Sequence, residues 1–192
     1  MKLYKYIYAI VFICLLLFVW LIYRSCNPQI SVDSNKKIDI TPEQITAIRD
    51  IGQWEFLAVT DEEIVDTVRK GIFSDDHLAR IYYGTLRFGI DLRQLSDHAF
   101  ITNGDTLMAT MPKIKLLDEH FIDEARTRSF YESGHWQATD REAMYQRAHR
   151  QMLQHAYTPQ NMQAAKNNGE EQMQKFLQAM GFRNVIIHFE DN

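Results

Sequence analysis

The sequence predicts an α+β fold: a mostly antiparallel or mixed β-sheet with two C-terminal helices packed on one face, preceded by an N-terminal transmembrane helix. Three patterns support this prediction. Residues 6–23 are uncharged and apolar or aromatic, residues 54–111 have the composition and alternation of β-strands, and residues 139–180 repeat apolar side chains every three or four positions. The chain accordingly divides into a cytoplasmic N-terminus (1–5), a transmembrane helix (6–23), a stalk (24–40) and an α+β domain (41–192).

The uncharged run at the N-terminus has the length of a membrane span. At about 1.5 Å per residue, residues 6–23 nearly cross a hydrocarbon core of roughly 30 Å. Tyrosine and tryptophan at both ends of the run suit the membrane interfaces. A cleaved signal peptide does not fit, because no pair of small residues follows the run. Lipid attachment at Cys26 stays open as a rival, although Tyr23, Arg24 and Ser25 are unlike the small residues that such a site favours.

The charges around the run predict its orientation. Lys2, Lys5 and the amino terminus precede it, whereas Arg24 alone follows directly. Because positive residues favour the cytoplasmic side, we expect residues 27–192 beyond the membrane, in the periplasm if the cell is a bacterium. The whole chain has a net charge of −4 and the first 24 residues carry +3, so the remainder carries −7. Such an acidic domain is not expected to bind nucleic acid.

The first half of the domain reads as one short helix followed by strands. A helix start at residues 41–44, with Thr41 as N-cap and Gln44 completing a capping box, predicts a helix that Gly52 closes. Strands are predicted over 54–69 and 78–92. Residues 61–63 (Asp-Glu-Glu) are either a turn or an exposed part of a long strand.

A hairpin and two helices are predicted to follow. Asn103-Gly104-Asp105 between apolar runs is a strong hairpin signal. Thr139 begins a second capping box, and Thr158 with Pro159 begins another helix. Gly181 lies where a left-handed helix cap belongs. Residues 185–189 read as a closing strand that returns to the sheet. The apolar positions of the two helices are Tyr145, Ala148, Met152 and Ala156, then Met162, Ala165, Gly169, Met173, Phe176, Leu177 and Met180.

The sequence carries no recognisable catalytic, metal or nucleotide motif, so we expect no cofactor. Both cysteines, Cys14 and Cys26, precede the domain, which excludes a thiol nucleophile or cysteine-based zinc site within it. His149 and His155 are six positions apart and should lie on opposite faces of a helix. No acidic cluster has metal-ligand spacing, and the seven histidines read as scattered.

One stretch resembles a known bacterial family. Residues 84–92 (Gly-Thr-Leu-Arg-Phe-Gly-Ile-Asp-Leu), the turn at 103–105 and Met111-Pro112 resemble the family catalogued as domain of unknown function 4230, as does the ending Gly181-Phe182 with its apolar strand. Phe88 and Met111 depart from the family pattern, which favours alanine and leucine there. The resemblance implies a membrane anchor and this architecture, and no reaction. It marks six motif residues, interpreted as structural: Gly84, Gly89, Asp91, Leu92, Pro112 and Gly181.

Two functions from different classes are compatible with these observations. The first is a non-enzymatic binding or scaffolding domain of the cell envelope, bound to membrane lipid through residues 6–23. It would form a homo-oligomer, through the helices at 139–180, or bind an envelope protein. The order of its parts is similar to that of band-seven (stomatin and prohibitin) scaffolds, by analogy only. The alternative is a membrane-tethered hydrolase with an acid–base site around Asp91, Asp105 and His120.

Overall fold

A computed structural model describes residues 16–17, 20 and 40–191 of the chain. The predicted transmembrane helix (6–23), the stalk (24–40) and Cys26 fall almost entirely outside these residues. Within the described ranges, no helix combines the length and the apolar character needed to cross a membrane.

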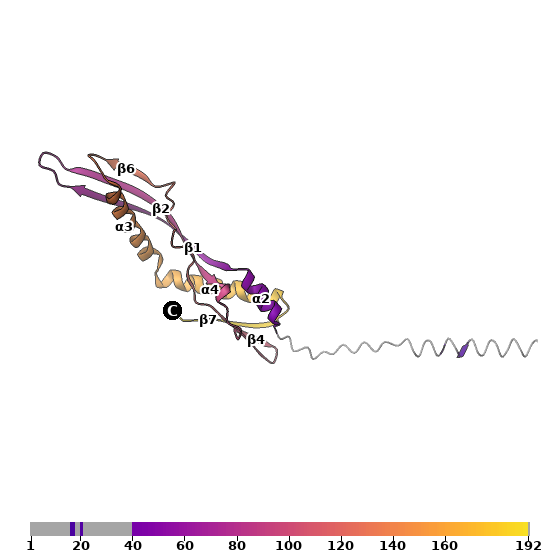
Figure 1. Ribbon diagram of the computed structural model, residues 1–192. Coiled ribbons are helices and arrows are strands. Elements are labelled where there is room, and N and C mark those ends of the chain that lie inside the picture. Colours follow the sequence, from indigo (N-terminus) through magenta and orange to yellow (C-terminus); the bar gives the residue numbers. More distant parts are fainter. Residues whose placement is uncertain (1–15, 18–19, 21–39, 192) are drawn as a thin grey trace, which may run out of the picture. The chain divides into compact units, whose positions relative to one another are not determined.

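The described domain contains two separate β-sheets, against which the two C-terminal helices pack (Figure 1). One sheet is built on the long hairpin of β1 and β2, and the smaller one contains β3, β4 and β7. In chain order the elements are α2 (Pro42–Asp50), β1 (Gln53–Arg69), β2 (Asp76–Asp91), η1 (Leu92–Gln94), β3 (Phe100–Asn103), β4 (Thr106–Met111), β5 (Lys115–Leu116), β6 (Arg128–Glu132), α3 (Ala138–Ala156), α4 (Pro159–Ala179) and β7 (Asn184–Phe189).

The β1–β2 hairpin is the longest feature of the domain. The two strands pair antiparallel from Gln53 opposite Asp91 to Arg69 opposite Asp76, and β5 and β6 pair with the other edge of β2. Residues 61–63 lie in the middle of β1, so the strand continues through them and the turn interpretation is wrong. Strand β6 was not predicted from the sequence, because all five of its residues are exposed and show no alternation.

The closing strand does not join the sheet of the hairpin, so the prediction of a single sheet needs correction. β7 pairs parallel to β4, while β3 and β4 form the predicted antiparallel hairpin. β7 pairs with the edge of β4 that β3 leaves free. The combination of antiparallel and parallel pairs confirms the predicted α+β class with mixed sheets.

A β-bulge directs the end of the hairpin toward α4. The register shifts between Glu55 and Leu57, so Trp54 and Phe56 both turn toward the C-terminal elements. The Trp54 ring meets Phe176 at 5.2 Å, and the Phe56 ring meets Phe189 at 5.6 Å, both edge to face. The bulge thereby joins the hairpin sheet to α4 and β7.

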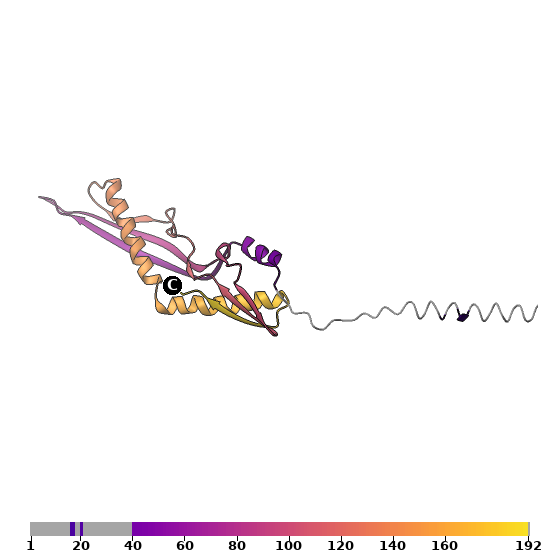
Figure 2. The same cartoon turned by 60° about the horizontal axis from the view of Figure 1, so that its bottom comes forward.

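The two C-terminal helices form as predicted, with one boundary corrected. Figure 2 shows α3 lying along the β1–β2 hairpin and α4 continuing beside β7. Helix α3 begins at Ala138 with Gln137 as N-cap, two residues before the predicted Thr139. The earlier start arises because the Asp140 carboxylate accepts the Gln137 backbone N–H at 2.8 Å. At the other end of α4, Gly181 has a φ of +108°, the left-handed conformation that a helix cap requires.

Candidate functional site

The motif residues of the hairpin are held by packing and backbone contacts. A Cβ on Gly89 would lie 2.0 Å from the Trp54 carbonyl oxygen at the bulge, so only glycine fits there. A Cβ on Gly84 would lie 3.0 Å from the Met152 sulfur of α3. Leu92 and Pro112 are buried, and the Leu92 N–H donates to the Gly52 carbonyl oxygen at 2.8 Å. These contacts favour the structural interpretation of the motif.

The three residues of the hydrolase hypothesis each contact a different neighbour. Asp91 is nearly buried and accepts hydrogen bonds from the Arg93 backbone and guanidinium, which lower the pKa of its carboxyl. Asp105 accepts the Asn184 side-chain amide at 2.6 Å in the β3–β4 turn. The exposed His120 ring lies 3.8 Å from Asp118. Among the contacts of the described residues, none joins one of these three side chains to another.

One group of side chains has the composition of a metal site, which the sequence expectation of scattered histidines and unclustered acids missed. Asp61, Glu63 and His155 each offer a ligand atom within 4.8 Å of the other two, and this is the one such group in the described part of the chain. The His155 Nδ1 lies 3.2 Å from Asp61 and 3.4 Å from Glu63. A hydrogen bond between the His155 ring and the Asp61 carboxylate also explains this proximity. The sequence did contain a sign of this group: Asp61 and Glu63 are two positions apart on a strand, so both side chains lie on the same face.

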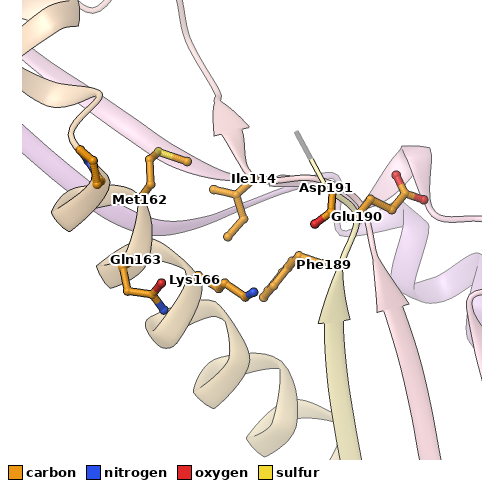
Figure 3. Close-up of a pocket in the computed structure, with 8 residues that line it drawn as sticks. Ile114, Met162, Gln163, Lys166, Phe189, Glu190 and Asp191 are labelled. Carbon is orange, nitrogen blue, oxygen red and sulfur yellow. The ribbon is translucent and has the colours of Figure 1, made fainter.

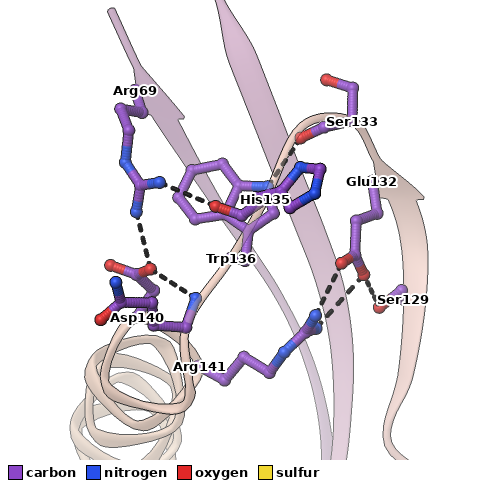
Figure 4. A network of polar contacts seen from close by, with 9 residues as sticks. Arg69, Ser129, Glu132, Ser133, His135, Trp136, Asp140 and Arg141 are labelled. Carbon is purple, nitrogen blue, oxygen red and sulfur yellow. Dashed lines mark hydrogen bonds and ion pairs between the residues drawn. The ribbon is translucent and has the colours of Figure 1, made fainter.

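A polar network fixes the start of α3 to the hairpin and to β6 (Figure 4). The Arg69 guanidinium donates to Asp140 and to the His135 carbonyl oxygen, both at 2.7 Å, and stacks over the Trp136 ring. The Arg141 guanidinium holds Glu132 of β6 through two nitrogens, at 2.6 and 3.2 Å. This bidentate pair lowers the pKa of the Glu132 carboxyl.

Arg141 of this network also lines a pocket of about 260 Å³ between β2, α3 and the segment before β6. We call it the α3 pocket. The Tyr82 side chain is 1% exposed, and its hydroxyl has no hydrogen-bond partner among the described residues. The Arg80 Nε atom is likewise buried and unpartnered, and its guanidinium carbon lies 5.5 Å from the centre of the Tyr82 ring. The lining residues are Arg80, Tyr82, Glu124, Thr127, Ala138, Arg141, Glu142 and Tyr145.

Burial raises the pKa values of both tyrosines of the α3 pocket. At the Tyr82 hydroxyl, the positive charges of Arg80 and Arg141 and a hydrogen bond with Arg80 oppose the increase. At Tyr145, the negative charges of Glu124 and Glu142 add to the effect of burial.

A second pocket, of about 210 Å³, lies where α4 meets the end of β7. We call it the C-terminal pocket. Figure 3 shows Met162 and Lys166 of α4 across from Ile114 and Phe189. Its lining combines these apolar side chains with charged ones, Lys166 on one element and two acids on the other, and more of its accessible surface is polar than apolar. The lining residues are Ile114, Pro159, Met162, Gln163, Lys166, Phe189, Glu190 and Asp191.

The turn between β1 and β2 carries the most exposed apolar side chains of the domain. Ile72 is 94% exposed and Phe73 is 100% exposed. We call these two residues the apolar tip. Lys70 and Asp75 flank it and form a salt bridge at 3.1 Å.

These features define an α+β domain in which two C-terminal helices cover a long β-hairpin that ends in an exposed apolar turn. The chain belongs to the family described as protein of unknown function (DUF4230), whose family model matches residues 46–187. No curated protein and no solved structure matches the chain.

Proposed function

We propose that this chain is a membrane-anchored, non-enzymatic scaffolding domain that assembles with further copies of itself at the bacterial cell envelope. The anchor rests on the sequence: the uncharged residues 6–23, with more positive charge before them than directly after, favour a single-pass helix in the inner membrane. The same bias favours a periplasmic domain. The separate partners of Asp91, Asp105 and His120 weigh against the hydrolase alternative.

The observation that carries the proposal is the apolar tip. Soluble surfaces expose scattered apolar residues, but two adjacent large ones at the end of a projecting turn make a contact element for a partner. Fully burying an isoleucine or a phenylalanine stabilises a contact by about 1.5–3 kcal/mol each. The tip therefore contributes roughly 3–6 kcal/mol to an association that covers it.

The partner we favour is a second copy of the chain, through its C-terminal pocket. A cavity of about 150 Å³ holds a benzene ring, so about 210 Å³ accommodates the Phe73 side chain. The charges also match. Lys70 beside the tip complements Glu190 and Asp191 on the pocket rim, and Asp75 complements Lys166.

The tip cannot reach the C-terminal pocket of its own chain. Phe56 contacts Phe189, which lines that pocket, whereas β1 continues for thirteen residues beyond Phe56 before the turn. At about 3.3 Å per residue the strand carries the tip roughly 40 Å away. When each copy offers its tip to the next copy and its pocket to the previous one, the contact is heterologous and generates rings or filaments. A reciprocal exchange of tips would instead close a two-fold dimer.

The proposal is tested by sedimentation of the full-length protein in detergent. The wild type should form oligomers, whereas the double variant Ile72→Ser, Phe73→Ser should be monomeric with an unchanged melting temperature, because neither side chain is buried in the domain. Ile101→Ser is the matched control, since it removes an exposed isoleucine from a different hairpin. A monomeric wild type, or oligomers that survive the double substitution, would contradict the proposal. Protease protection of the domain in intact spheroplasts would contradict the periplasmic placement.

A further inference from the structure

We propose that Asp61 and Glu63 of β1 and His155 of α3 form a binding site for a divalent transition-metal ion, with Zn²⁺ as the favoured ion. Two carboxylates and an imidazole are among the ligands that zinc uses in proteins. The site is separate from the self-assembly surfaces, because none of its residues belongs to the apolar tip or lines the C-terminal pocket.

The three side chains meet where the last turn of α3 crosses β1. Asp61 and Glu63 share one face of the strand, and the side chain of His155 lies against both. The two acidic side chains are only 21% and 13% exposed, and two carboxylates held side by side away from water are unfavourable without positive charge. Among the salt bridges of the described residues, His155 is their one basic partner, and it carries at most one positive charge. At least one negative charge is therefore left unbalanced on this packed face.

The distances between these groups are those of ligands around one metal ion. The His155 Nδ1 atom lies 3.2 Å from Asp61 and 3.4 Å from Glu63. One ring nitrogen carries at most one proton, so it donates a hydrogen bond to only one of the two carboxylates. With ligands at about 2.0–2.2 Å in tetrahedral or octahedral geometry, neighbouring ligand atoms are roughly 2.8–3.6 Å apart. Because the three ligand atoms lie within 4.8 Å of one another, a small rotation of either carboxylate lets one ion contact all of them.

A buried oxygen without a partner lies on the same row of α3. The Arg147 guanidinium donates to the Asp66 carbonyl oxygen of β1 at 2.8 Å, and the His155 ring contacts Asp61 earlier in that strand. Gln151 is four positions from both of these helix residues, so it shares their face and lies beside the strand between their contacts. Its Oε1 atom is buried and has no hydrogen-bond partner among the described residues. Beside two carboxylates, such an acceptor needs a positive neighbour, and a bound cation supplies it.

The ligand set favours a transition metal over calcium or magnesium. Ca²⁺ and Mg²⁺ prefer oxygen ligands, whereas an imidazole nitrogen suits Zn²⁺ and its neighbours in the transition series. His155 is 58% exposed, so an ion and its remaining water ligands can enter from solvent. A bound ion would join the hairpin to the last turn of α3, directly before α4 begins, and should therefore stabilise the domain.

The test is thermal unfolding and isothermal titration calorimetry of the untagged, metal-free, full-length protein in detergent with ZnCl₂. Zn²⁺ at a hundredfold excess over its dissociation constant should raise the melting temperature by about 5–10 °C. His155→Gln, Glu63→Gln and Gln151→Met should each weaken Zn²⁺ binding about tenfold or more. His149→Gln is the matched control and should bind as the wild type does, because His149 belongs to the same helix but contacts the Glu119 carbonyl oxygen.

Three results would overturn the proposal. The first is the absence of binding and of stabilisation at submillimolar Zn²⁺. The second is an equal effect of Ca²⁺, which would indicate general attraction of cations to an acidic domain. The third is full affinity in any of the three variants, which would place an adventitious ion outside this group. Because the His155 side chain is more than half exposed, its variant should fold and keeps the test decisive.

Discussion

Replacing Tyr82 with phenylalanine should stabilise the domain. The substitution keeps the buried ring, with its edge-to-face contact to Tyr145, and removes only the unpartnered hydroxyl. Burying an unpaired polar group costs about 1–3 kcal/mol. The nearby Arg80 guanidinium recovers part of this cost, so we expect a net gain in unfolding free energy of about 1 kcal/mol. For a domain of roughly 150 residues, this raises the melting temperature by about 2–4 °C.

The assay is thermal unfolding of the full-length protein, followed by circular dichroism in detergent. Tyr83→Phe serves as the control. The Tyr83 hydroxyl accepts a long hydrogen bond of 3.4 Å from Arg128 at the surface, so removing it should leave the melting temperature within error. A decrease of 2 °C or more in Tyr82→Phe would refute the reasoning, because it would show that the hydroxyl is satisfied in the free protein.

Two further predictions concern the motif residues. Gly89→Ala should destabilise the domain by about 3 kcal/mol or more in urea unfolding, because the new Cβ would lie 2.0 Å from the Trp54 carbonyl oxygen. The control Gly104→Ala should cost only about 1 kcal/mol, because its Cβ meets open space and only the positive φ is unfavourable. Equal costs for the two variants would contradict the argument that the bulge requires glycine at position 89. Asp91→Asn should cost about 1 kcal/mol at pH 7 through its lost pairing with Arg93. Because the pairing lowers the pKa of Asp91 below its usual 3.8, the wild-type advantage should be complete above pH 3.8 and disappear as the pH falls through the lowered pKa. Melting temperatures at pH 7 and pH 3 measure it, and a difference that is the same at both would contradict the assignment.

Local signals were sufficient to predict most elements of the domain. The capping box of Thr41 and Gln44 forms as expected, with bonds at 2.8 and 3.3 Å. The Asn103-Gly104 turn joins β3 and β4, and α4 buries the predicted stripe that includes Gly169 and Leu177. In each case the contacts that determine the element join residues close together in the sequence, so a short stretch of sequence is enough to predict it.

The division into two sheets and the α3 pocket depend on contacts between distant residues. Strand β7 pairs with β4, which lies more than seventy residues earlier in the sequence. Strand β6 has no apolar face, so its sequence does not have the alternation that predicts a strand. The pocket combines Arg80 and Tyr82 of β2 with residues of α3 some sixty positions later. The sequence did contain one sign of the pocket. Leu78, Arg80 and Tyr82 lie on the same face of β2, and the neighbours of Arg80 on that face are buried. A charged residue on a packed face requires a partner or a ligand.

Disulfide formation between chains tests the contact of the apolar tip with the C-terminal pocket most directly. Cys14 and Cys26 are first replaced by serine, and two chains are then co-expressed, one with Ser74→Cys beside the tip and one with Gln163→Cys at the pocket. Because a disulfide requires Cα atoms within about 7 Å, oxidation of native membranes should give a mixed dimer, which adding Phe73→Ser to the first chain removes. Absence of the mixed dimer, or its persistence without Phe73, would contradict head-to-tail assembly through the tip.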